Sequence, residues 1–90
     1  MIRFLGEIKG RVQGVGFRFF TYKLAGKHHL TGWVRNSSNG TVEFEVQGVK
    51  NEVEKFLDKI KNAKYPAKVT DLKIYEISVD KSNDSFQVIK

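Results

Sequence analysis

A glycine-rich segment followed by an arginine is the part of this sequence best suited to chemistry. Residues 10–18 read G-R-V-Q-G-V-G-F-R. Glycines adopt positive φ readily and let backbone N–H groups approach a ligand, and the start of a helix presents N–H groups without partners. Such a loop binds anions, and the guanidinium of Arg18 can form bidentate hydrogen bonds with phosphate oxygens. The alternative interpretation is that this segment binds no ligand and forms only a tight turn beside a solvated arginine.

Two better-known glycine motifs do not match this segment. A P-loop requires a lysine followed by serine or threonine after its last glycine, and no such pair follows a glycine here. The dinucleotide fingerprint requires a third glycine at position 19, where the chain has Phe19. The sequence therefore indicates neither ATP nor NAD.

Hydrophobic periodicity predicts the elements that must position the loop. Residues 2–12 alternate apolar and polar side chains, as in a half-buried strand. Residues 17–29 repeat apolar side chains at helical spacing. Residues 30–36 and 42–46 alternate on either side of a turn that contains Asn-Gly, which predicts a hairpin.

The second half of the chain predicts another helix and another strand. Asn51 is expected to cap the helix, with Glu54 three residues later to complete a capping box. The strand that follows, over 72–79, changes phase between Ile74 and Ile77, which predicts a bulge there.

A short last strand at 86–88 completes the order strand, helix, strand, strand, helix, strand, strand. This order predicts an α+β, ferredoxin-like two-layer sandwich, a βαββαβ unit plus a short C-terminal strand. Two helices would cover one face of a mainly antiparallel sheet. Residues 1–90 are expected to form a single domain.

The predicted lengths bring Asn36 to the glycine loop. A helix over 17–29 runs away from the loop for about 20 Å, and a strand over 30–36 returns for about 23 Å. Asn36 should therefore lie at the same end of the molecule as Arg18. Its amide is both donor and acceptor and could hold a water molecule near a phosphorus atom. The alternative interpretation is that Asn36 is an ordinary asparagine that begins a turn.

Two stretches resemble the signatures of the acylphosphatase family. They are residues 10–18 and residues 32–48, the latter reading G-W-V-R-N-S-S-N-G-T-V-E-F-E-V-Q-G, and the resemblance covers essentially the whole chain. It implies hydrolysis of the carboxyl-phosphate bond of acyl phosphates to a carboxylate and inorganic phosphate, without a metal or organic cofactor. It also implies a catalytic arginine at Arg18 and a catalytic asparagine at Asn36. The phosphate-binding loop implied by the resemblance comprises Val12, Gln13, Gly14, Val15 and Gly16.

The few functional side chains near the loop are sufficient for this reaction. A carboxylate leaving group has a conjugate acid with a pKa of about 4, so it can depart without being protonated. We expect Arg18 and the loop amides to hold the phosphoryl oxygens, Asn36 to position the water, and the substrate's own phosphate oxygen to take the proton. His28 is predicted to be a histidine of the core edge or surface, since it lies about 15 Å along the helix from Arg18.

The charge leaves a wider range of anionic partners open. The net charge is +6, and residues 1–45 carry +4 of it. A lysine-rich surface explains this excess as well as an anionic ligand does. An RNA-recognition domain is disfavoured because Glu43 and Glu45 occupy the strand where such domains contact RNA. A non-catalytic anion-binding or regulatory domain stays open, as does a piece of a larger carbamoyl-transfer maturation protein.

Composition sets the remaining expectations. The chain contains no cysteine, which excludes disulfides and thiolate catalysis. It has no long apolar run, and Glu7 and Lys9 interrupt the stretch that a signal peptide would need. We therefore expect a free-standing cytoplasmic protein, a monomer, with no nucleic-acid or membrane partner.

Overall fold

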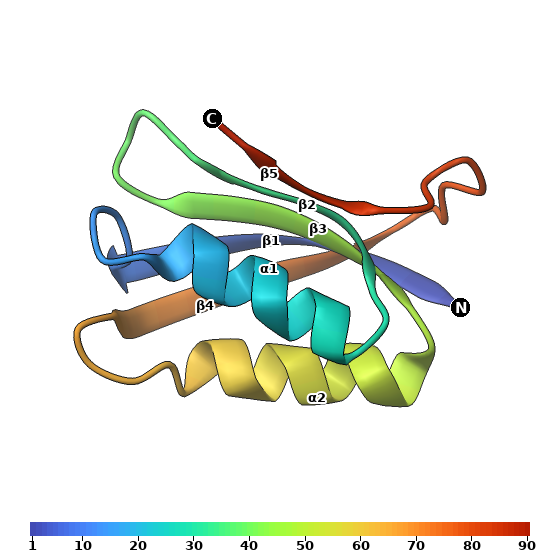
Figure 1. Cartoon of the computed structure of the whole chain (residues 1–90), viewed down its shortest axis with the longest axis horizontal. Helices are drawn as coiled ribbons and strands as arrows, with labels where there is room; N and C mark the ends of the chain where they lie inside the picture. Colours follow the sequence, from blue (N-terminus) through green and yellow to red (C-terminus); the bar gives the residue numbers. More distant parts are fainter.

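Two helices lie on one face of a five-stranded sheet (Figure 1). The structure is a computed structural model that describes residues 1–90. Its elements are β1 (Ile2–Arg11), α1 (Phe17–Lys27), β2 (Thr31–Asn36), β3 (Val42–Gly48), α2 (Lys50–Lys61), β4 (Lys68–Ile77) and β5 (Phe86–Ile89). The strand order is β4-β1-β3-β2-β5. The predicted ferredoxin-like sandwich is confirmed.

The sheet is mainly antiparallel, as predicted. β1 pairs antiparallel with β3 and β4, and β2 pairs antiparallel with β3. β5 pairs with β2 in parallel and forms one edge of the sheet. In Figure 1 the C-terminal strand therefore lies beside β2.

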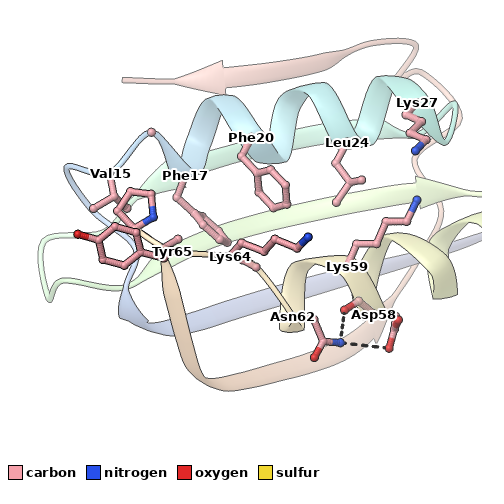
Figure 2. A pocket seen from close by; sticks show the side chains of 14 residues that line it. Val15, Phe17, Phe20, Leu24, Lys27, Asp58, Lys59, Asn62, Lys64 and Tyr65 are labelled. Carbon is pink, nitrogen blue, oxygen red and sulfur yellow. Dashed lines mark hydrogen bonds between the residues drawn. The ribbon is translucent and has the colours of Figure 1, made fainter.

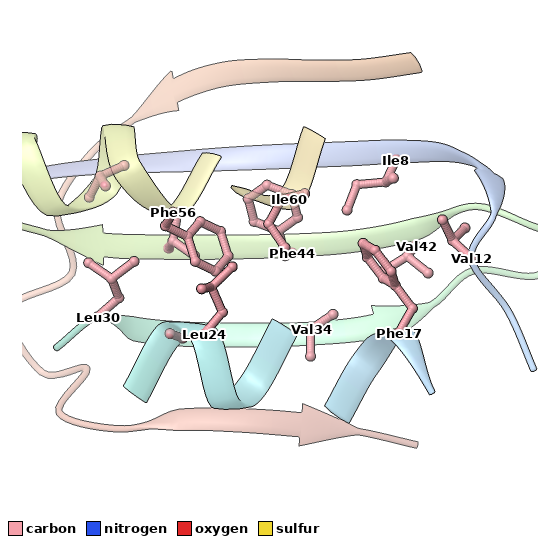
Figure 3. Packing of buried hydrophobic residues seen from close by; sticks show 13 residues of the cluster. Ile8, Val12, Phe17, Leu24, Leu30, Val34, Val42, Phe44, Phe56 and Ile60 are labelled. Carbon is pink, nitrogen blue, oxygen red and sulfur yellow. The ribbon is translucent and has the colours of Figure 1, made fainter. Parts of the chain in front are cut away.

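The core lies between the sheet and the two helices (Figure 3). Phe44 of β3 and Phe56 of α2 meet edge to face at its centre, with ring centroids 5.7 Å apart. Ile8 of β1 is fully buried beside them, whereas its neighbour Lys9 is exposed on the opposite face. The alternation predicted for the first strand is thus confirmed.

The predicted cap of α2 is wrong. The residue before the helix is Val49, in an extended conformation with no side-chain hydrogen bond to the helix. Asn51 lies inside the first turn, so Asn51 and Glu54 form no capping box. The helix begins earlier because the backbone N–H of Val53, a buried residue, already bonds to the carbonyl of Val49, 3.0 Å away.

The predicted bulge between Ile74 and Ile77 is also wrong. The register with β1 shifts opposite Gly10 instead, where Thr70 is skipped. Ile74 pairs with Gly6 on the helix-covered face, whereas Ile77 pairs with Arg3 on the other face. β4 is an edge strand with apolar residues on both faces, and this breaks the simple alternation without any change in backbone register.

Replacing Gly32 with Ala is expected to lower the free energy of unfolding by about 2 kcal/mol or more. Gly32 has φ +138, and a Cβ atom there would overlap the backbone carbonyl of Glu45 on β3. Urea denaturation measures the effect. The control is Gly26→Ala in α1, where a Cβ atom meets nothing within 4 Å and helix propensity favours alanine by about 1 kcal/mol. Equal unfolding midpoints for the two variants would contradict this account.

Candidate active site

The loop between β1 and α1 leaves the first N–H groups of the helix available to a ligand. Gly14 and Gly16 have φ values of +74 and +77, which bend the chain sharply before α1. Gly16 is the N-cap residue, so no side chain caps the helix, and the first turn contains no acidic residue. The uncapped N–H groups and the positive end of the helix dipole favour an anion at this position.

A cavity of about 540 Å³ gathers most of the predicted site residues. It is lined by Val12, Gly14, Gly16, Phe17, Arg18, Phe19, Asn36, Val88 and Lys90. The cavity joins the loop, the first turn of α1, the end of β2 and the end of β5. The expectation that Asn36 would return to the glycine loop and Arg18 is confirmed.

Two of the five predicted loop residues lie outside this cavity. Gln13 turns toward the connection between β2 and β3, where its Nε2 donates to the carbonyl oxygens of Ser37, at 2.8 Å, and Thr41, at 3.0 Å. Val15 lines an adjoining groove between the two helices (Figure 2). Gln13 therefore braces the loop against the turn that follows Asn36.

Arg18 is held by a residue that the sequence did not indicate. Its Nη1 donates to the backbone carbonyl of Ile89 on β5, at 3.1 Å. A guanidinium has five N–H donors in a planar fork, so one such bond orients the group and leaves the others for a ligand. The partner was missed because it is a main-chain carbonyl 71 residues away.

A polar cluster anchors the connection that leads into β5. Arg3 is 4% exposed, and it donates to Glu45, at 2.8 Å, and to Asn83, at 2.9 Å. The backbone N–H of Asp80 donates to the Gln47 side chain, at 2.7 Å. Hydrogen bonds from Ser82 lower the pKa of the Asp80 carboxyl. These contacts fix the loop over the sheet and hence the strand that supports Arg18.

Asn36 presents an unpaired polar atom at the site. It is the last residue of β2, and its Oδ1 is buried with no hydrogen-bond partner. A buried acceptor without a partner costs about 1–3 kcal/mol, so such groups need an explanation. Since Asn36 lines the cavity, its oxygen can accept a hydrogen bond from a water molecule or ligand there.

The histidine nearest to the loop in sequence lies at the far end of α1. His28 is 5% exposed at the edge of the core, as predicted. Its Nδ1 lies 2.9 Å from Glu52, and this hydrogen bond lowers the pKa of the Glu52 carboxyl. No group of three or more His, Cys, Asp or Glu side chains is placed to share a metal ion.

Comparison with known proteins identifies the family. The acylphosphatase family model matches residues 5–88. An acylphosphatase of Bacillus licheniformis is 45% identical over 87 residues, covering 97% of this chain and 93% of that protein. The chain belongs to the acylphosphatase family. It is accordingly an enzyme that hydrolyses acyl phosphates to a carboxylate and inorganic phosphate.

Solved acylphosphatase structures share the fold. The crystal structure of acylphosphatase from Bacillus subtilis superposes with a TM-score of 0.94 at 36% identity, covering 100% of both chains. A full-length HypF, crystallised in a phosphate- and nucleotide-bound form, matches with a TM-score of 0.90 at 32% identity. The match covers 99% of this chain but only 12% of HypF. The acylphosphatase fold thus also occurs as a small part of a longer protein.

Replacing Gln13 with Leu is expected to lower kcat/KM for an acyl phosphate about tenfold, because a loosened loop misplaces its N–H groups. Unfolding stability should change little, since the carbonyls of Ser37 and Thr41 can bond to water. Gln87→Leu is the control, because the exposed side chain of Gln87 on β5 bonds only to the hydroxyl of Ser85, just before that strand. Unchanged kinetics in Gln13→Leu would show that the brace does not position the loop.

Proposed function

We propose that this acylphosphatase binds the phosphoryl group of its substrate with the loop of residues 12–16 and Arg18, and that Asn36 orients the attacking water. The observation that carries the proposal is that Asn36 and Arg18 line one cavity, while the Oδ1 atom of Asn36 is buried without a hydrogen-bond partner. A water molecule bonded to that oxygen can face a phosphorus atom held by the loop. None of the side chains of residues 12–16 can act as a general acid or base.

The charges of the reaction match the groups at the site. Charge spreads over the phosphoryl oxygens during transfer, and preorganised N–H donors stabilise it. The uncapped amides at the start of α1 and the free edge of the Arg18 guanidinium are such donors. The carboxylate leaves unprotonated, since its conjugate acid has a pKa of about 4. The water proton passes to an oxygen of the substrate's own phosphoryl group.

We further propose that residues 1–90 act as a single, monomeric, cytoplasmic domain without nucleic-acid or membrane partners. Two arginines on the helix-free face of the sheet pair with carboxylates: Arg3 with Glu45, and Arg35 with Glu43. These carboxylates would repel nucleic-acid phosphates. Neither helix has the length and apolarity needed to cross a bilayer.

The test is hydrolysis of benzoyl phosphate in the presence of a chelator, with Arg18→Ala measured alongside. We expect rapid hydrolysis by the parent, unaffected by the chelator, and loss of activity in the variant. A folded parent that binds inorganic phosphate but does not hydrolyse benzoyl phosphate would instead indicate a non-catalytic anion-binding domain.

A further inference from the structure

A second cavity adjoins the candidate active site. It is a groove of about 640 Å³ between α1 and α2, closed at one end by the connection from α2 to β4 (Figure 2). Its apolar lining comprises Val15, Phe17, Phe20, Leu24, Ala63, Pro66 and Ala67. Phe20 is 38% exposed, so an aromatic face that the core does not cover is available inside the groove. Nothing in the reaction proposed above uses this groove.

The groove and the active-site cavity are neighbours at the start of α1. Gly16 and Phe17 line both of them. Apart from its two neighbours in the chain, no residue has an atom within 4 Å of the position where a Cβ atom of Gly16 would be, so the space above this residue is open. A molecule whose phosphoryl group rests on the N–H groups of the loop can therefore extend past Gly16 into the groove.

The rim of the groove is positively charged. Lys27, Lys59 and Lys64 line it, against a single carboxylate, Asp58. The neighbouring ammonium group of Lys27 is the main cause that lowers the pKa of Lys59. Lysine stems add apolar surface while their ammonium groups stay in water. The rim therefore attracts an anionic substrate and repels an acyl group that ends in a cation.

We propose that this groove binds the acyl group of the substrate, and that the preferred substrates are acyl phosphates with an extended apolar acyl group, aromatic or medium-chain aliphatic. The inference rests on the proposed function, because it requires the phosphoryl group to lie on the loop. α1 has 11 residues, so its flank of the groove is about 16 Å long. That length accommodates a chain of several methylene groups.

Chain length should act on binding. Each methylene group buried in the groove is expected to lower KM about twofold to fourfold. Contacts far from the reacting atoms are the same in the ground state and the transition state, so kcat should stay nearly constant. In the parent enzyme, octanoyl phosphate should therefore have a KM at least about tenfold below that of acetyl phosphate.

The discriminating variant is Phe20→Ala. We expect it to raise KM for octanoyl phosphate about tenfold and to leave acetyl phosphate within about twofold. Tyr22→Ala is the matched control, since Tyr22 is 44% exposed on the same helix but does not line the groove. Equal effects of Phe20→Ala on the two substrates, or a KM in the parent that is independent of chain length, would overturn the proposal.

A binding measurement separates this proposal from the proposed function and does not depend on how well Phe20→Ala folds. Octylphosphonate and methylphosphonate are added to the ¹⁵N-labelled parent protein. Octylphosphonate should shift the amide resonances of residues 63–65, Ala67 and Phe20, and methylphosphonate only those of the loop. If acyl phosphates are not hydrolysed, the proposed function fails, yet these shifts still support the groove. If both probes shift only the resonances of the loop, the proposal that the groove binds the acyl group is overturned.

Discussion

Replacing Arg18 with Ala is expected to lower kcat/KM for benzoyl phosphate by about a thousandfold or more, the effect of removing an arginine that stabilises a transferring phosphoryl group. The affinity for inorganic phosphate should fall as well, because the same guanidinium is proposed to bind the phosphoryl group in the ground state. Stability should change by less than about 0.5 kcal/mol, since the bond to Ile89 is exposed. Steady-state kinetics, phosphate titration and thermal unfolding measure the three effects.

Two further arginine variants make the result specific. Arg18→Lys keeps the charge but loses the planar fork that bonds to Ile89 and is proposed to bond to the phosphoryl oxygens, so it should recover only a small part of the activity. Arg35→Ala removes an arginine that pairs with Glu43 and stacks on Trp33 on the helix-free face. It should remain fully active. Arg18→Ala with more than a tenth of the parental activity would refute the assignment.

Replacing Asn36 with Ala is expected to lower kcat about a hundredfold to a thousandfold, with much smaller changes in KM and in phosphate affinity. The side chain is proposed to act on the water, not on the phosphoryl group. This separation of kcat from KM distinguishes Asn36 from Arg18, for which both should change. Single-turnover measurements with benzoyl phosphate would locate the loss in the chemical step.

Stability provides an independent readout for the same variant. Asn36→Ala removes a buried oxygen that has no partner, and leaving such an atom unpaired costs about 1–3 kcal/mol. The variant should therefore be as stable as the parent or more stable, while much less active, which is the pattern of a residue kept for function. Undiminished kcat in Asn36→Ala, or a loss of stability that accounts for the lost activity, would contradict the role.

Local patterns in the chain were enough to predict the fold. Alternation identified β1 and the hairpin, and helical spacing identified α1, because side-chain direction repeats with a fixed period within each element. The predictions that failed, the cap at Asn51 and the bulge near Ile74, concern details that depend on neighbouring elements. The start of α2 depends on where β3 ends. β4 has apolar residues on both faces because it is an edge strand.

The residue types available to the site can be read from the chain alone. So can the return of Arg18 and Asn36 to one end of the molecule, since element lengths follow from the number of residues. The contacts that hold these side chains in place depend on how the elements pack. Arg18 donates a hydrogen bond to the backbone carbonyl of Ile89. Gln13 donates to the backbone carbonyls of Ser37 and Thr41. Every residue has such a carbonyl, so these partners leave no signal in the sequence. The groove beside the loop exists for a similar reason, because α1 and α2 are separate in the chain and are brought together by packing on one sheet.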